Sequence, residues 1–95
     1  MNVDSSPLSG IRVLELSHGV PGPQLAKIMG DFGADVIKVE APNPTGGFKG
    51  GKTDTRGWNP LHNEVNRNKR GLALDLKQPA NVGKLKRLVA ISDVV

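Results

Sequence analysis

The sequence predicts an α/β protein built on a parallel sheet. Three short segments with the character of β-strands occur at residues 11–16, 35–40 and 71–76. One segment with helical periodicity lies between the first two strands, and another follows the third. Strands and helices that alternate along a chain favour parallel strands joined by right-handed crossovers. The expected order is β-α-β-loop-β-α-β.

The first strand and its helix are joined by a turn. Residues 11–16, IRVLEL, are short and apolar and follow Ser9-Gly10, as is typical of a buried strand. Residues 17–23, SHGVPGP, hold two Gly and two Pro and predict a turn. The helix that follows has an apolar stripe that we expect to face the core: Leu25, Ile28, Met29 and Phe32. Pro23 suits its first turn, and Gly33 its C-terminal cap.

The second half repeats the pattern after a long connection. Residues 35–40, DVIKVE, predict the second strand. Residues 41–70 form a basic loop rich in Gly and Pro, and its length indicates a functional segment or one that is disordered without ligand, with a short helix near 59–66. Residues 71–76, GLALDL, predict the third strand.

The second helix opens at Pro79, and a fourth strand begins at residues 93–95. Its expected apolar face is Val82, Leu85, Leu88 and Val89, and its expected solvent face is Lys84, Lys86 and Arg87. A parallel sheet is normally covered on both faces, and two helices cover four strands poorly. We therefore expect residues 1–95 to be the incomplete N-terminal part of a larger domain.

Composition narrows the class of protein. The 95 residues contain no Cys, which excludes a disulfide framework and a thiolate metal site. The N-terminal segment lacks a signal-peptide pattern, and no apolar run reaches the roughly 18 residues of a membrane span. We expect a cytoplasmic protein without a membrane partner. The net charge of +4 is uneven, since residues 1–40 carry −2 and residues 41–95 carry +6. Such a local excess favours a site for an anionic ligand.

Two stretches could form that site. The turn after the first strand precedes a helix N-terminus, where free N–H groups attract anions, and Gly19 and Gly22 would allow close approach of a ligand. An ordinary tight turn is the alternative, and His18 alone is more typical of a turn than of a catalytic base. The second stretch is the cationic run of Arg67, Lys69 and Arg70, which suits phosphate or else a solvated loop.

Other classes of site fit less well. A dinucleotide site needs an acid such as Glu40, 21 residues after Gly19, but Pro21 breaks the required glycine pattern. The basic part of the sequence lacks the interleaved aromatic residues that stack on nucleic-acid bases, and we expect no nucleic-acid partner. His18 and His62 stand apart from any metal-ligand spacing, so we expect no metal.

Three blocks carry a family resemblance: PLSGIRVLELSHGVPGPQLAKIMGDFGADVIKVEAP, NRNKRGLALDLKQP and SDVV. Together they resemble the N-terminal region of class III CoA-transferases, which include formyl-CoA transferase, carnitine CoA-transferases and alpha-methylacyl-CoA racemase. The resemblance covers residues 7–95 apart from a variable stretch near 43–62, and members of this family are several-fold longer.

The resemblance implies a Rossmann-like domain that binds coenzyme A. Residues His18, Gly19, Val20 and Pro21 match the turn near the thioester end of coenzyme A. Residues Leu74, Asp75, Leu76 and Lys77 match the segment against the adenosine end. Lys77 is then the preferred residue to contact a phosphate of coenzyme A, and the cationic run before it has a supporting or structural role. Coenzyme A or acyl-CoA would be a substrate, and no covalently bound cofactor is expected.

Two departures from the family pattern bear on specificity. Val20 stands where some of these transferases carry glutamine, which weakens the case for formyl or oxalyl substrates. Ala41 stands where several carry an arginine, and the glycine- and lysine-rich stretch 46–52 is a candidate replacement for that phosphate contact.

The implied reaction is exchange of coenzyme A between an acyl-CoA and a carboxylic acid through an aspartate nucleophile. That aspartate lies beyond Val95 in the family, so no catalytic residue is assigned here, and the 95 residues alone are expected to be inactive. A racemase that moves the proton next to the thioester is one alternative. A non-catalytic module that binds an anionic nucleotide or nucleic acid is another. Family members form interlocked homodimers.

Overall fold

The computed structural model describes residues 6–17, 20–41 and 64–95. In these ranges the elements are β1 (Arg12–Glu15), α1 (Pro21–Asp31), β2 (Asp35–Glu40), β3 (Lys69–Ala73) and α3 (Pro79–Ala90). They alternate in the predicted order, so the α/β class is confirmed.

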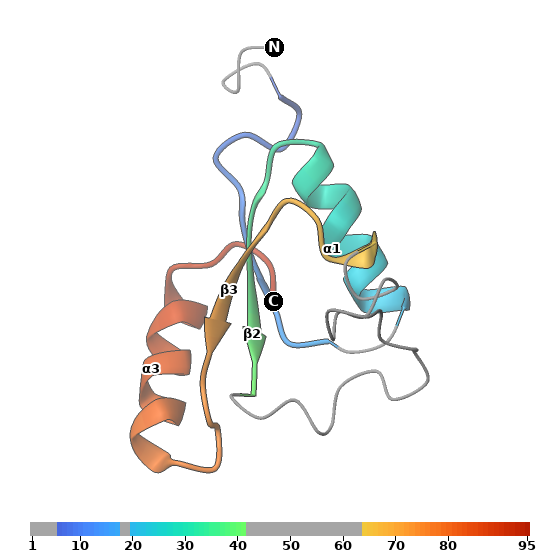
Figure 1. Cartoon of the computed structure of the whole chain (residues 1–95). Helices are drawn as coiled ribbons and strands as arrows, with labels where there is room; N and C mark the ends of the chain where they lie inside the picture. Colours follow the sequence, from blue (N-terminus) through green and yellow to red (C-terminus); the bar gives the residue numbers. More distant parts are fainter. Residues whose placement is uncertain (1–5, 18–19, 42–63) are drawn as a thin grey trace, which may run out of the picture.

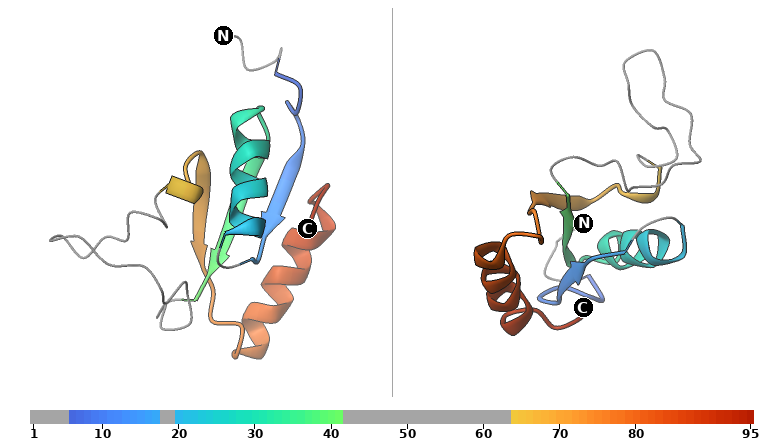
Figure 2. Two further views of the ribbon diagram at one scale, coloured as in Figure 1. Left: turned by 90° about the vertical axis from the view of Figure 1, so that its right-hand side faces the viewer. Right: turned by 90° about the horizontal axis from the view of Figure 1, so that it is seen from below.

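The three strands form one parallel sheet in the order β1-β2-β3. The helices lie on opposite faces of this sheet, α1 on one side and α3 on the other (Figures 1 and 2). Val94 pairs in parallel with Val13, on the side of β1 away from β2. The predicted fourth strand is therefore present as a single bridge, and the order of neighbours across the sheet reverses direction at β1.

Strand boundaries agree best where the sequence pattern is clearest. The predicted range 35–40 coincides with β2, and β1 is one residue shorter at each end than predicted. The third strand was misplaced, because β3 begins at Lys69 rather than Gly71. Lys69 and Arg70 align with Val36 and Ile37 of β2, so the end of the cationic run belongs to the strand.

The apolar stripe predicted for the first helix does not face the core. Leu25 is 60% exposed and Phe32 51%, and Ile28 is also exposed. Met29 does pack against the core cluster. The buried residues of α1 are instead Pro23, Ala26 and Lys27.

Small residues explain the rotation of α1. Ala26 packs with Val13 and Val36 of the sheet, and Gly30 lies near Val36 and the turn at Asn68. A Cβ atom at Gly30 would lie 3.1 Å from the Asn68 carbonyl oxygen. The helix therefore packs mainly through small residues, which allow a close approach to the sheet, and most of its larger apolar side chains, Met29 excepted, point outward.

The predicted cap at Gly33 is confirmed. Its φ of 102° is a left-handed conformation that favours glycine. The Gly33 N–H donates to the Gly30 carbonyl at 3.0 Å, and the Ala34 N–H donates to the Met29 carbonyl at 3.0 Å. These two bonds form the Schellman arrangement that ends many helices. A side chain at Gly33 would also collide with Ser6.

The second core lies between the sheet and α3. Leu14, Val39 and Leu74 are buried there, with Leu85 and Leu88 of α3 packed against them. The prediction for this helix holds for Leu85 and Leu88 but is wrong for Val89, which is 40% exposed. No residue of α3 is fully buried, so this helix contributes only part of its surface to the core.

Part of the long connection lies outside the described residues, namely 42–63. Most of the helix predicted at 59–66 falls there too. The described end of the connection is packed on the protein, since Val65 is 4% exposed. Among the helices that the structure describes, none is long and apolar enough to cross a membrane.

Candidate functional site

The carboxyl ends of β1, β2 and β3 meet at one edge of the sheet, because the strands are parallel. Both helices begin near this edge (Figure 1). Ligands of open α/β sheets bind at this edge, where helix N-termini present unpaired N–H groups. Residues of a ligand site should therefore lie at this edge.

The structure brings the predicted residues to this edge in two groups. Val20 immediately precedes α1 and is 39% exposed, and Pro21 is the first residue of that helix. Leu74 follows β3 directly and is buried, whereas Leu76 and Lys77 are exposed in the turn before α3. The first group follows β1 and the second follows β3, so β2 lies between them. His18 and Gly19 lie outside the described residues.

The turn that carries Lys77 is fixed by hydrogen bonds around Asp75. The Lys77 backbone N–H donates to Asp75 Oδ1 at 3.1 Å, and Asn81 Nδ2 donates to the Asp75 carbonyl at 3.0 Å. Within the described part of the chain, the Lys77 ammonium has no hydrogen bond or ion pair. An exposed cation on an ordered turn can accept a phosphate without first giving up another partner.

A cavity of about 430 Å³ lies beside the first group. Its lining includes Leu16, Ser17, Gly22 and Leu25, together with Val94 and Val95 from the end of the chain. It lies under α1, over β1 and the fourth-strand residues, where the strand order reverses. This reversal is the usual ligand position in open α/β sheets.

Gly22 has a structural role at this cavity. A Cβ atom at this position would collide with the Ser17 side chain. We predicted that Gly22 leaves room for a ligand, but the space next to its backbone is filled by Ser17.

Three buried charged residues form an ion cluster below the turn between β1 and α1: Glu15, Lys38 and Lys69. The exposed fractions of their side chains are 4%, 7% and 2%. Glu15 Oε2 lies 3.2 Å from Lys38 Nζ, and Glu15 Oε1 lies 2.7 Å from Lys69 Nζ. The contact to Oε1 is an ion pair without hydrogen-bond geometry, since that oxygen accepts no hydrogen bond from the described residues.

Neighbouring side chains and backbone carbonyls complete the cluster. Ser17 Oγ donates to Glu15 Oε2 at 2.7 Å, and Lys38 Nζ donates to the Ser17 carbonyl at 3.1 Å. Lys69 Nζ donates to the Pro23 carbonyl at 3.0 Å and to Asn66 Oδ1 at 2.7 Å. Buried charges are tolerated when they are paired and hydrogen-bonded in this way.

The cluster shifts the pKa of two of its members. Burial raises the pKa of Glu15, but Lys69, Ser17 and Lys38 together outweigh it, and the net pKa lies below the usual 4.5. Burial lowers the pKa of Lys69, and the nearby Glu15 carboxylate only partly opposes that effect.

The low pKa of Glu15 predicts a loss of stability in acid. The unfolded chain takes up the proton near pH 4.5, before the folded protein does. The stabilisation from this carboxylate is therefore present above pH 4.5 and is lost as the pH falls through the lower native pKa. A titration followed by the NMR shift of the Glu15 carboxyl carbon should give a midpoint below 4.5. A midpoint at or above that value would contradict the ion cluster.

The cations of the predicted phosphate-binding run all have partners within the chain. Arg67 pairs with Asp31 at 2.9 Å and Arg70 with Asp35 at 2.7 Å, while Lys69 belongs to the buried cluster. The hydrogen bond from Arg67 is the main cause that lowers the pKa of Asp31. These contacts favour the structural role over direct phosphate contact.

Sequence reasoning missed Glu15 and Lys38 as a pair. Each is a charge inside an otherwise apolar strand, and the two are aligned across β1 and β2. Opposite charges in adjacent buried strands are the signal that could have identified them.

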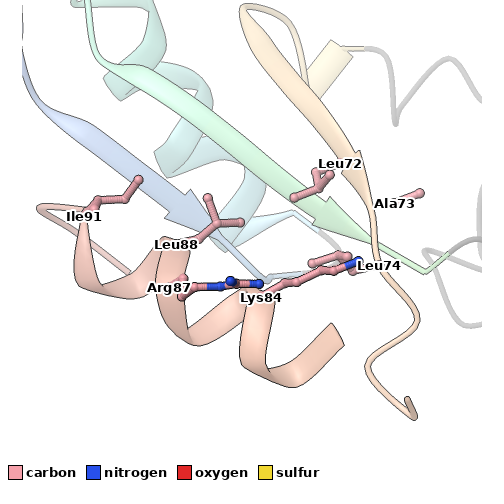
Figure 3. A pocket seen from close by; sticks show the side chains of 7 residues that line it. All are labelled: Leu72, Ala73, Leu74, Lys84, Arg87, Leu88 and Ile91. Carbon is pink, nitrogen blue, oxygen red and sulfur yellow. The ribbon is translucent and has the colours of Figure 1, made fainter. Parts of the chain in front are cut away.

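A second cavity, of about 490 Å³, lies between the sheet and α3. Figure 3 shows its apolar lining, which includes Leu72 and Leu74 opposite Leu88 and Ile91. The cationic side chains of Lys84 and Arg87 lie beside them. This cavity shares only Leu74 with the predicted site residues and lies on the other face of the sheet from α1.

Comparison with known proteins assigns almost the whole chain to one family. The family described as CoA-transferase family III matches residues 8–95. A succinate–glutarate CoA-transferase from Agrobacterium fabrum is 42% identical, over 94% of this chain and 24% of its own length. The human alpha-methylacyl-CoA racemase is 41% identical, over 93% of this chain and 19% of its own length.

Solved structures agree with the sequence matches. A CAIB/BAIF family protein from Brucella suis superimposes with a TM-score of 0.74 at 33% identity, over 94% of this chain and 25% of that one. A hypothetical protein from Mycobacterium tuberculosis gives a TM-score of 0.70 at 29% identity, over 95% of this chain and 24% of that one. The chain thus spans about a fifth to a quarter of the length of the proteins it matches. With a match across almost every residue, the chain belongs to CoA-transferase family III.

Proposed function

We propose that this chain is the N-terminal part of an enzyme that transfers coenzyme A between carboxylic acids, and that the carboxyl edge of its sheet binds the coenzyme A. The family match over residues 8–95 carries the proposal. The fold supports it, because two helices begin at that edge and a cavity lies beside the first of them. The nucleophilic aspartate belongs to a part of such enzymes beyond residue 95.

The two groups of residues bind opposite ends of coenzyme A. Val20 and Pro21, with His18 and Gly19, lie near the thioester end. Leu76 contacts the adenosine, the ammonium of Lys77 binds a phosphate, and Leu74, which is buried in the core, anchors this segment. An exposed lysine is a point charge that can pair with phosphate in several geometries.

A racemase is the second candidate for the whole protein. It is favoured by the 41% identity to the human alpha-methylacyl-CoA racemase. The apolar Val20 is also compatible with a branched acyl group near the thioester. In either case we propose an acyl-CoA substrate, an interlocked homodimer and a cytoplasmic location, with neither nucleic acid nor membrane as partner.

Replacing Lys77 by alanine tests the phosphate contact. We expect the dissociation constant for coenzyme A to rise about tenfold, which corresponds to about 1.4 kcal/mol. The affinity for dephospho-CoA should change much less if Lys77 contacts the 3′-phosphate. Isothermal titration calorimetry with both ligands measures the difference.

Lys86→Ala is the matched control, since Lys86 is an exposed lysine of α3 away from the carboxyl edge. Equal losses of affinity in Lys77→Ala and Lys86→Ala would mean that only general charge attraction is involved, and would count against the assigned role of Lys77.

A further inference from the structure

The buried ion cluster is hydrogen-bonded to the backbone at the start of the turn between β1 and α1 and again in the first turn of α1. At its start, the Ser17 carbonyl accepts a hydrogen bond from Lys38 at 3.1 Å. Beyond its end, in the first turn of α1, the Pro23 carbonyl accepts one from Lys69 at 3.0 Å. The two lysines converge on the single carboxylate of Glu15. One buried carboxylate thus connects the start of the turn that leads into α1 with the first turn of α1 itself.

Neither lysine is placed to touch a ligand of that turn. Their side chains are 7% and 2% exposed, and neither Lys38 nor Lys69 lines the cavity beside β1. Their contacts with the turn go to backbone carbonyl oxygens, whose positions define the path of the chain. Any effect of these lysines on a bound ligand must therefore act through the geometry of the backbone.

The cluster also reaches a third segment. Lys69 donates to Asn66 Oδ1 at 2.7 Å, and Asn66 lies at the end of the long connection between β2 and β3. The first turn of α1 and the segment that leads into β3 are therefore held by the same ammonium group.

We propose that Glu15, Lys38 and Lys69 are positioning residues, which fix the spacing between Ser17 and Pro23 and so orient Val20 and Pro21 toward coenzyme A. This proposal rests on the proposed function. The two lysines act on ligand affinity without touching the ligand, whereas Glu15 also lines the cavity beside β1.

Stability alone does not account for this arrangement. Apolar residues of similar volume often stabilise a fold as well as a buried ion cluster does. Directional hydrogen bonds to two particular carbonyl groups specify geometry, which apolar packing does less well. One carbonyl lies at the start of the turn and the other in the first turn of α1, which indicates that the cluster specifies the path of the backbone into this helix.

The experiment compares Lys69→Met with a matched control, Asp35→Asn, in the purified protein. Lys69→Met leaves Glu15 paired with Lys38 and removes the lysine donor to the Pro23 carbonyl. Asp35→Asn also removes an ionic partner, that of Arg70 at 2.7 Å, but at the first residue of β2, at the opposite edge of the sheet. Lys38→Met is the second test variant and keeps the Lys69 contacts. For each, urea unfolding gives stability and calorimetry gives the dissociation constant for coenzyme A.

The expected result is a dissociation constant about tenfold higher in Lys69→Met and Lys38→Met, under conditions where each variant is fully folded. Asp35→Asn should bind like the parent protein even where it loses similar stability. Unchanged affinity in both lysine variants would overturn the proposal, and so would a parallel loss in Asp35→Asn.

A measurement without ligand separates this proposal from the proposed function. The Gln24 N–H donates to the Val20 carbonyl at 2.9 Å in the first turn of α1. Its hydrogen exchange should be faster in Lys69→Met and unchanged in Asp35→Asn. If the parent protein binds no coenzyme A, the proposed function fails, and this comparison still decides whether the cluster positions the turn. Equal exchange rates in Lys69→Met and the parent would overturn the positioning role.

Discussion

Replacing Glu15 by glutamine is expected to lower the free energy of unfolding by about 3–5 kcal/mol, because removing one partner of a buried ion pair leaves its counter-charge uncompensated. Here two ammonium groups, those of Lys38 and Lys69, would lose the same carboxylate. Since domains are typically stable by about 5–15 kcal/mol, this loss is a large share of the total. Urea unfolding followed by far-UV circular dichroism measures it.

A triple variant separates the loss of charge balance from the loss of packing. In Glu15→Leu/Lys38→Met/Lys69→Met, no buried charge of the cluster remains, and the stability should return close to that of the parent. A Glu15→Gln variant within about 1 kcal/mol of the parent, a typical loss for any point mutation, would contradict the buried cluster.

Truncating Leu14 to alanine is expected to cost about 2–5 kcal/mol, the usual range for a buried leucine. Leu14 is 1% exposed and packs in the core between the sheet and α3. The lost methyl groups would leave a cavity, since the strand backbone around this position is held by hydrogen bonds on both sides. Chemical unfolding of the purified variant measures the cost.

Ile28→Ala is the matched comparison, because sequence periodicity predicted Ile28 as a core residue too. In the structure it is 41% exposed, and its truncation should change stability by roughly 0.5 kcal/mol or less, as for other exposed positions. Similar losses for Leu14→Ala and Ile28→Ala would mean that the α1 stripe is buried in the protein in solution.

The contrast between these two residues shows what the sequence could predict about the fold. Alternating strand and helix patterns gave the parallel sheet, and Gly33 gave the end of α1. Apolar periodicity in α1 predicted the wrong face, because a stripe of large apolar side chains does not say which neighbour covers it. The small residues Ala26 and Gly30 determine how α1 sits on the sheet, and their preference is visible only once β1 and β2 are in place.

The candidate site, like the fold, could be predicted only in part from the sequence. The resemblance to a family placed Val20 and Lys77 near the ligand, and parallel strands bring both to one edge. The cationic run was harder to interpret, since Arg67, Lys69 and Arg70 look alike in sequence. Their partners Asp31, Glu15 and Asp35 come from segments at least 35 residues earlier in the numbering. Local composition cannot reveal pairings that depend on strand register.

Mapping coenzyme A onto the protein by NMR tests the central claim most directly. In a titration followed by backbone amide shifts, we predict that the largest changes occur at Val20, Gln24, Leu76 and Lys77, around the carboxyl edge. Amides at the opposite edge, such as those of Arg12 and Asp35, should change little. Shifts concentrated at Lys84, Arg87 and Ile91, beside the cavity under α3, would contradict the account, as would the absence of any saturable change.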